Sequence, residues 1–208
     1  GFYGCDDIYG YKYGSMGLAI NAYKTSLSIK KSKIFSSNLP KKFTTPILKY
    51  LKLKKVSSNF EINLLSQPPN HIGLGSGSQL SLCLGKSILT HLDIKASISD
   101  IARIYDRGER SGTGIRIFER GGFVVDACKK ANMLPETMFN SKFPSKWKII
   151  LINDNQLKGA SGEKEVKFFN KNIKLSRQYK AELSHIALRG ILPSIIYKDF
   201  DNFSKNIS

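Results

Sequence analysis

The sequence predicts an α+β fold, and three observations lead to this expectation. First, a chain of 208 residues with 41% hydrophobic residues can bury a substantial core, which fits one domain and part of a second. Second, an apolar, strand-like run at 60–65 leads directly into a glycine-rich loop, after which apolar residues recur at helical spacing. Third, two short helical patterns, at 98–105 and 112–118, precede another apolar strand near Phe123. We find no internal repeat.

Further elements lie on either side of these. Residues 17–34 alternate like strand material, and we expect residues 44–53 to form a short helix before the strand at 60–65. Beyond Phe123, two prolines at 135 and 144 bracket a segment that we expect to be irregular. Residues 146–152 read as a strand.

The C-terminal part has a different character from the rest. After a turn at 159–162 the chain is mostly helical to Phe203, with a break near 190–193, where a glycine and a proline interrupt the pattern. We therefore expect a boundary near residue 140. It would divide an N-terminal domain, 1–140, from the beginning of a C-terminal domain, 141–208.

The glycine-rich loop is the most informative stretch. Gly73, Gly75 and Gly77 allow a positive φ and close approach, so that consecutive amides can point inward at an anion. The helix expected from Ser76 adds free N–H groups and the positive end of its dipole. Ser76 and Ser78 could cap this helix, bond a phosphate oxygen or bind a magnesium ion, and the sequence does not choose among these. The predicted phosphate or diphosphate site comprises Gly73, Leu74, Gly75, Ser76, Gly77 and Ser78.

This loop differs from two common phosphate-binding loops. It has no Gly-Lys-Ser/Thr ending as in a P-loop, and its glycine spacing is not that of G-x-G-x-x-G. A glycine-rich segment is often a simple turn, so its shape alone leaves the phosphate role open.

A second glycine–serine loop follows, flanked by arginines. Arg107 and Arg110 are permanently charged, forked donors suited to phosphate, and Ser111 and Gly112 extend the predicted phosphate site. The alternative for the arginines is a solvated basic face, or pairing with the neighbouring carboxylates at 106 and 109. Asp126 could hold magnesium, directly or through water, or could simply end its strand as a turn residue.

Three weaker substrate candidates lie outside this pair of loops or at their margin. His71 could bind a phosphate or an aromatic carboxylate, although a histidine bonded to backbone is as common. Gln79 follows the glycine loop. Glu165, with Glu163, lies after Ser161, and a helix N-cap followed by an acidic first turn explains these residues equally well.

These motifs resemble those of a known superfamily. The pattern Pro69-x-x-x-Gly73-Leu74-Gly75-Ser76 is similar to the ATP loop of GHMP kinases, and three blocks, 71–80, 107–126 and 147–165, resemble the beta-ribofuranosylaminobenzene 5'-phosphate synthase branch. The resemblance implies an N-terminal part like the second domain of ribosomal protein S5, followed by a mostly helical, ferredoxin-like α+β part. The family's first strand, with its Arg-x-His motif, would precede Gly1, and the family continues past Ser208, which predicts a fragment or shortened copy.

One position separates the synthase from the kinases. Kinases of this superfamily carry Ser-Gly-x-Asp, whose aspartate helps to activate the substrate hydroxyl, whereas this chain has Gly114 in that place. The synthase reaction that the resemblance implies joins 4-aminobenzoate to 5-phosphoribosyl 1-diphosphate with loss of CO2 and diphosphate, in tetrahydromethanopterin biosynthesis. For this reaction we predict Arg107, Arg110 and Asp126 as catalytic residues and Mg2+ as cofactor, held by Asp126 and Ser76. The alternatives are a GHMP-type ATP-dependent small-molecule kinase and a non-catalytic, S5-like RNA-binding module.

The formal net charge of +17 indicates anionic partners. Lysines are dispersed along the chain instead of forming one basic helix, which favours phosphorylated small molecules and an aromatic acid over nucleic acid, although an RNA-binding role stays open. No apolar run has membrane-spanning length and no segment reads as a signal peptide, so we expect a cytoplasmic protein without a membrane partner. Its three cysteines are widely spaced and show no zinc pattern, as in a protein with reduced thiols. Exposed strand edges would allow a homo-oligomer.

Overall fold

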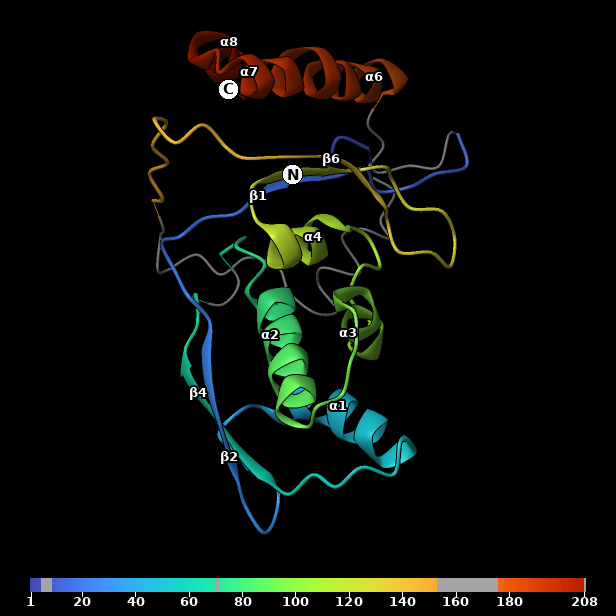
Figure 1. The fold of residues 1–208 in the computed structure, drawn as a ribbon. Coiled ribbons are helices and arrows are strands. Elements are labelled where there is room, and N and C mark those ends of the chain that lie inside the picture. The colour runs from blue at the N-terminus through green and yellow to red at the C-terminus, as the bar shows by residue number, and fades with distance from the viewer. Residues whose placement is uncertain (5–8, 70–71, 153–175, 208) are drawn as a thin grey trace. The chain divides into compact units, whose positions relative to one another are not determined.

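The computed structural model describes residues 1–4, 9–69, 72–152 and 176–207, and it confirms the α+β fold (Figure 1). Two compact units make up the chain. The first comprises Gly1–Ala19 and Arg110–Ser208, and the second comprises Ile20–Glu109. Each unit is described by itself. The division expected near residue 140 stays a prediction.

The sheet of the second unit has the strand order β2-β4-β3. Strand β2 (Ser26–Lys31) runs antiparallel to β4 (Phe60–Ser66), and the short β3 (Ser36–Ser37) runs parallel to β4. Because β3 and β4 are parallel, the chain needs a crossover between them, and α1 (Lys41–Leu53) supplies it. The strand predicted at 60–65 is therefore central in its sheet.

Helix α2 (Ser76–His91) packs against β2 of this sheet, and α1 and α3 (Ile98–Ile104) pack against α2 and against each other. Helix α1 begins before the predicted position because Phe43, Ile47 and Leu51 form a buried stripe at helical spacing, which outweighs the proline at position 46. Helices α2 and α3 approach closely at Gly85, where a Cβ atom would lie 2.4 Å from Cγ2 of Ile101. The core of the unit includes the fully buried side chains of Ile47, Leu51, Phe60, Ile62, Leu80, Leu84, Ile88 and Ile101.

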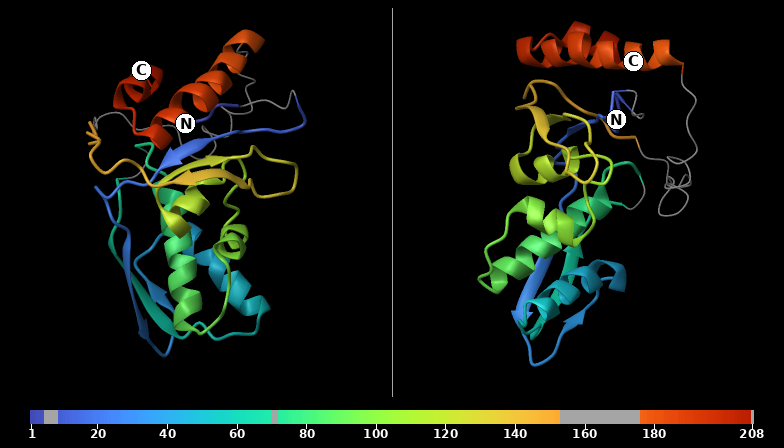
Figure 2. Two further views of the ribbon diagram at one scale, coloured as in Figure 1. Left: turned by 45° about the horizontal axis from the view of Figure 1, so that its top comes forward. Right: turned by 90° about the vertical axis from the view of Figure 1, so that its right-hand side faces the viewer.

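The sheet of the first unit is entirely antiparallel, with the order β1-β5-β6. Strands β1 (Met16–Leu18) and β6 (Thr137–Ser141) flank β5 (Phe123–Asp126), which is buried along its whole length. Helix α4 (Thr113–Arg120) packs on one face, and the C-terminal helices pack on the other (Figure 2). Side chains alternate along a strand, so Phe123 and Val125 of β5 meet the C-terminal helices, whereas Asp126 lies on the side of α4.

The C-terminal helices are α6 (Arg177–His185), a π-helical segment η1 (Ile186–Ile191), α7 (Leu192–Tyr197) and α8 (Phe200–Ile207). The break predicted near 190–193 is wrong. The π-helical segment η1 carries the helix through Gly190 and continues directly into α7, of which Pro193 is the second residue. The interruption comes instead at Lys198, which has a left-handed backbone with φ of 58°.

Two predictions for residues 135–152 are also wrong. The segment between the prolines is not irregular but contains β6, which pairs with β5. Residues 146–152 form no strand, and Ile150 and Ile152 are 84% and 92% exposed. Here Trp147 is held by aromatic packing, since its ring centroid lies 4.8 Å from that of Phe203. A strand-like pattern becomes a strand only where a partner strand is available.

Candidate functional site

The glycine loop leads from the end of β4 to the start of α2. Gly75, the N-cap of α2, is left-handed with φ of 64°, and Gly73 has φ of 79°. Residues with a Cβ atom adopt this conformation at a cost of about 1–2 kcal/mol, which explains glycine at both positions. The predicted start of the helix at Ser76 is confirmed.

The glycines of the loop have open surroundings. A Cβ atom added at Gly73, Gly75 or Gly77 would meet no heavy atom of the described residues within 4 Å. The amides of Ser78 and Gln79 donate to the carbonyl of Gly75, whereas the amides of Ser76 and Gly77 have no acceptor within the described part of the chain. The helix has 16 residues, no side-chain cap and no acidic residue in its first turn, so its positive dipole end is not compensated there. This geometry suits a phosphate group.

Arg107 lies beside the same helix. Its Nη2 donates to Oγ of Ser81 at 3.1 Å, and Ser81 Oγ donates to the carbonyl of Gly77 at 2.9 Å. The arginine follows α3 and is positioned by a bond from its own amide to the carbonyl of Ala102 at 2.8 Å. The structure thus brings Arg107 and the glycine loop together, although they are far apart in the sequence.

The second glycine–serine loop is closed by a carboxylate. Asp126 is 1% exposed, and its Oδ1 accepts from the amide of Ser15 at 2.8 Å. Its Oδ2 accepts from Oγ of Ser15 at 2.5 Å and from the amide of Gly112 at 2.9 Å. Asp126 is therefore not a turn residue but the buried end of β5. The expectation that the Gly112 amide binds phosphate does not agree with this arrangement, because that amide already has an anionic acceptor.

Three hydroxyl groups continue this network. Oγ of Ser15 lies 2.6 Å from Oγ of Ser111, which lies 2.7 Å from Oγ1 of Thr113. Ser15 and Thr113 are buried, and Ser111 is half-buried. Ser15 could not be identified from the sequence, because nothing local in the sequence links it to a carboxylate 111 residues away. Only the pairing of Met16 with Val125 between β1 and β5 brings them together.

A tyrosine supports the backbone of the same carboxylate residue. The hydroxyl of Tyr3 donates to the carbonyl of Asp126 at 2.5 Å and lies 3.5 Å from Sγ of Cys128. Burial, together with the neighbouring thiol, raises the pKa of Tyr3 above its ordinary value, so the phenol stays protonated and remains a donor.

The remaining predicted site residues are placed as follows. Arg110 directly precedes the second loop and belongs to the first unit, whereas Arg107 belongs to the second, so a common role of the two arginines stays a prediction. His71, Glu163 and Glu165 lie outside the described residues.

The predicted magnesium ligands, Asp126 and Ser76, belong to different units, so a shared ion stays a prediction. Both carboxylate oxygens of Asp126 accept hydrogen bonds from the protein, and Ser76 is a buried residue of the other unit. Residues 1–4, 9–69, 72–152 and 176–207 contain no group of three His, Cys, Asp or Glu side chains that could hold a metal ion.

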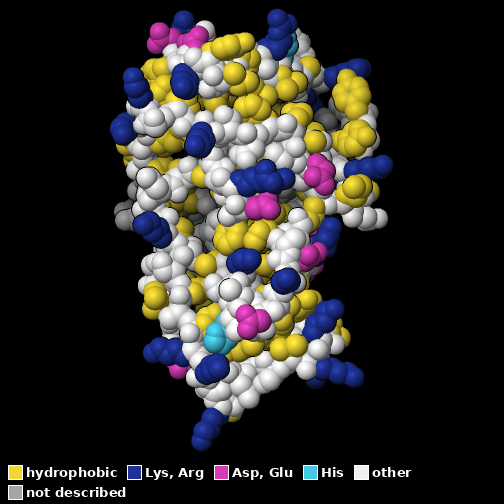
Figure 3. Space-filling model, in the orientation of Figure 1, with side chains coloured by type: hydrophobic (Ala, Val, Ile, Leu, Met, Phe, Trp, Pro, Cys, Tyr) yellow, Lys and Arg dark blue, Asp and Glu magenta, His cyan; other side chains and the backbone are white. Residues whose placement is uncertain are grey.

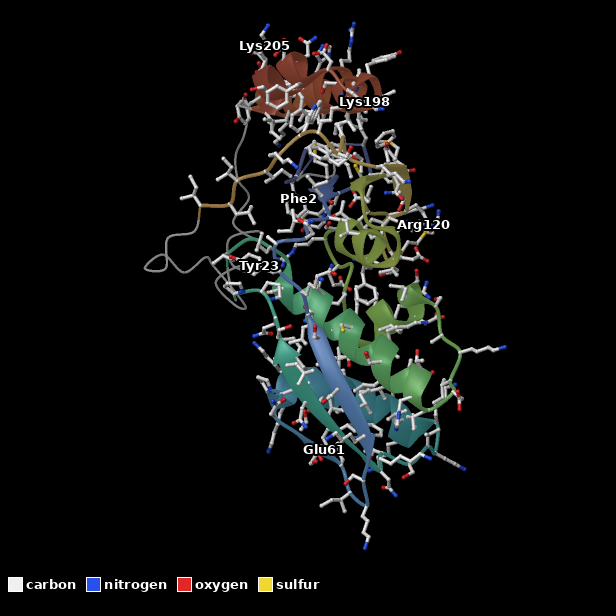
Figure 4. All side chains as sticks on the ribbon, turned by 60° about the vertical axis from the view of Figure 1, so that its left-hand side comes forward. Phe2, Tyr23, Glu61, Arg120, Lys198 and Lys205 are labelled. Atoms are coloured by element: carbon white, nitrogen blue, oxygen red, sulfur yellow. The ribbon has the colours of Figure 1, made fainter. Side chains whose placement is uncertain are left out.

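The surface supports the prediction of dispersed positive charge. On the face shown in Figure 3, Lys and Arg side chains are spread among apolar and acidic ones. Lys198 and Lys205 lie exposed on the C-terminal helices (Figure 4). Within the described ranges, no helix is both long and apolar enough to span a bilayer.

Comparisons with known proteins agree with the motifs. Residues 38–118 match the GHMP kinases N terminal domain. The chain is 34% identical over 158 residues to the beta-ribofuranosylphenol 5'-phosphate synthase of Archaeoglobus fulgidus, covering 70% of this chain and 50% of that protein. It is 32% identical over 171 residues to the synthase of the same name from Methanothermobacter thermautotrophicus, covering 75% and 52%. The chain thus spans about half the length of these relatives.

Solved structures show the same fold at low sequence identity. Phosphomevalonate kinase of Streptococcus pneumoniae aligns with a TM-score of 0.65 at 9% identity, covering 99% of this chain and 73% of that one. Homoserine kinase of Cytophaga hutchinsonii aligns with a TM-score of 0.57 at 15% identity, covering 88% and 61%. Residues 38–118 are therefore similar to a GHMP kinase N-terminal domain, and the chain as a whole is similar to the beta-ribofuranosylphenol 5'-phosphate synthases, as its motifs predict.

Proposed function

We propose that this chain acts in a phosphoribosyl-type transferase that joins an aromatic acid to 5-phosphoribosyl 1-diphosphate, with loss of CO2 and diphosphate. One observation carries the proposal. Helix α2 begins after two left-handed glycines, Gly73 and Gly75, and no side chain of its N-cap bonds the first amides, which can therefore donate to an anion. The chain is also similar to enzymes named for a ribofuranosyl 5'-phosphate product.

The leaving diphosphate needs donors that are in place before the reaction. The amides of Ser76 and Gly77 provide fixed dipoles, and the guanidinium of Arg107 beside α2 adds a permanent positive charge. Such groups stabilise the charge that develops as the bond between the anomeric carbon and diphosphate breaks. Fixed donors need little reorganisation during that step.

The acceptor is an aromatic acid with an electron-donating group para to its carboxylate. Our prediction names 4-aminobenzoate, whereas the relatives are named for a ribosylated phenol. An amino group and a hydroxyl group both raise electron density at the ring carbon that bears the carboxylate. That carbon attacks the sugar, and departure of CO2 restores the aromatic ring without removal of a proton.

The second loop is consistent with chemistry that needs no general base. Gly114, in α4, has no side chain where the kinases carry an aspartate. The nearby carboxylate of Asp126 is engaged by Ser15 and Gly112, so it serves to position the loop. Magnesium, if required, would enter with the diphosphate of the substrate, since Mg2+ is often bound through substrate phosphates.

Calorimetric titration with phosphoribosyl diphosphate and, separately, with ATP tests this proposal. We expect the wild-type chain to prefer phosphoribosyl diphosphate and the Gly75→Val variant to lose at least about tenfold in affinity, because the left-handed N-cap is disfavoured and its open side is filled. Gly10→Val is the matched control, since Gly10 also has a positive φ and open surroundings. A preference for ATP would indicate a kinase-like protein. Unchanged affinity in Gly75→Val would contradict the assigned loop.

Product analysis separates the acceptors. Incubation with phosphoribosyl diphosphate, magnesium and either 4-aminobenzoate or 4-hydroxybenzoate, followed by mass spectrometry, should give a decarboxylated ribosylated arene from one of the two. Ribosylation without loss of CO2 would contradict the proposed reaction.

A further inference from the structure

We propose that the groove between α1 and the end of α3 is a docking surface for an acidic, amphipathic helix of a partner protein. The groove lies wholly within the second unit and has a volume of about 590 Å³. The residues that line it are Lys41, Lys42, Thr45, Pro46, Lys49, Tyr50, Leu53, Ile104 and Asp106. Neither glycine loop contributes to this lining, so the inference does not depend on the proposed function.

Apolar side chains form one side of the groove. The stripe of α1 that faces the core is already buried. Outside this stripe, Pro46, Tyr50 and Leu53 line the groove together with Ile104 of α3. Leu53 is 82% exposed, so most of its side chain would be removed from water by a partner. Apolar area of this kind favours a partner that brings apolar side chains of its own.

Lysines form the other side of the groove. At about 3.6 residues per turn, Lys42 and Lys49 lie farther from the buried stripe of α1 than Tyr50 and Pro46 do. The groove therefore has an apolar inner side and a basic rim. Asp106 is the one carboxylate among the lining residues.

The charge around α1 is unusually uniform. Six lysines lie between residues 41 and 55, and residues 8–60 contain no aspartate or glutamate. Among the described residues, no carboxylate forms an ion pair with a lysine of this helix. The rim therefore lacks the interspersed acidic groups that balance a surface internally, and its charge is complementary to an acidic partner.

Two other occupants fit the groove less well. A second copy of this chain has a formal net charge of +17, so two such surfaces repel each other. Single-stranded nucleic acid is held largely by stacked aromatic rings with contributions from arginine, whereas the lining has one aromatic ring, that of Tyr50, and no arginine. A helix with apolar residues on one face and glutamates beside them matches both sides of the groove.

Fluorescence anisotropy with two dye-labelled peptides of about 18 residues tests the surface. Both peptides contain the same leucines and glutamates. In the first, the leucines recur at i, i+3 and i+7 and form a stripe along a helix, and in the second their order is scrambled. We expect the wild-type chain to bind the striped peptide at least about tenfold more tightly at about 0.15 M salt, because charge alone does not distinguish the two.

Two groove variants and two matched controls locate the binding. Leu53→Gln should lower the affinity for the striped peptide about tenfold, and Lys49→Glu about fivefold. Ile34→Gln and Lys33→Glu make the same chemical changes in the same unit at positions that do not line the groove, and each should change the affinity less than about twofold. All four residues are exposed, so we expect every variant to fold.

Equal affinity for the striped and scrambled peptides, or equal losses in the groove variants and their controls, would overturn the docking surface. An oligouridylate of about 20 nucleotides is titrated in the same buffer. Tighter binding of this RNA than of the striped peptide, weakened in Lys49→Glu but not in Lys33→Glu, would overturn the protein partner and assign the groove to RNA.

Discussion

The two glycine–serine loops of this chain look alike in sequence but differ in what their donors already bind. In the first, the amides of Ser76 and Gly77 find no acceptor in the described parts of the chain. In the second, the amide of Gly112 and the hydroxyl of Ser15 donate to Asp126. The first loop thus has two donors without an acceptor among the described residues, whereas in the second loop the donors bind the protein's own carboxylate.

This difference shows that the composition of a loop predicts its hydrogen-bond donors but not whether the protein already supplies acceptors for them. Glycines and hydroxyl residues make both segments suitable for anions. Whether an anion from outside can enter depends on a carboxylate that the fold brings from β5. The following changes test the contrast, beginning with the largest expected effect.

Removal of the internal anion should destabilise the protein strongly. In Asp126→Ala, two amides and one hydroxyl lose a buried acceptor, and we expect the free energy of unfolding to fall by about 3 kcal/mol. Urea unfolding monitored by circular dichroism measures this change. Ser78→Ala, in the open loop, is the comparison and should change stability by less than about 0.5 kcal/mol. A loss below about 1 kcal/mol in Asp126→Ala would mean that the closed loop does not depend on its carboxylate.

A paired glycine substitution should give effects of opposite sign. In Gly112→Ala the new Cβ would lie 2.5 Å from the backbone oxygen of Pro135, and we expect a loss of about 2 kcal/mol. In Gly77→Ala no atom of the described residues lies within 4 Å of the new Cβ, and the better helix former should raise stability by about 0.5 kcal/mol. Thermal unfolding of both variants checks the pair. Equal losses would remove the distinction between a closed and an open loop.

What the sequence could predict follows from the range of the interactions. The strand at Phe60, the loop and the start of α2 were predicted because glycine conformation and apolar periodicity act over a few residues. The contact between Asp126 and Ser15 could not be predicted, since Ser15 reaches the carboxylate only through the pairing of β1 with β5. For the same reason the local pattern predicted a strand at residues 146–152, where none forms, and an irregular segment where β6 pairs with β5. Local pattern shows what a segment can form, and tertiary pairing decides whether it does.

The start of α3 provides a third case, in which the helix closes its own donors locally. Ser97 accepts from the amide of Asp100 at 3.0 Å, and the carboxylate of Asp100 accepts from the hydroxyl of Ser97 at 2.6 Å and from its amide at 3.1 Å. These bonds, the hydroxyl first, lower the pKa of Asp100. Because this pKa is depressed in the folded state, the ionised carboxylate of Asp100 stabilises the fold at pH values above its unfolded pKa of about 3.9. This stabilisation is lost as the pH falls through the folded pKa.

Ser97→Ala should therefore cost about 1 kcal/mol at pH 7, and the gap from the wild-type chain should narrow below about pH 3.9 as Asp100 takes up a proton. It should not close completely, because the bond from the amide of Asp100 to the serine hydroxyl does not depend on the charge. Urea midpoints of both chains between pH 7 and pH 3 measure the gap. A gap that stays constant with pH would show that the hydroxyl alone caps α3. A narrowing gap would show that a local carboxylate fills the donors of this helix start, as the distant Asp126 does for the second loop.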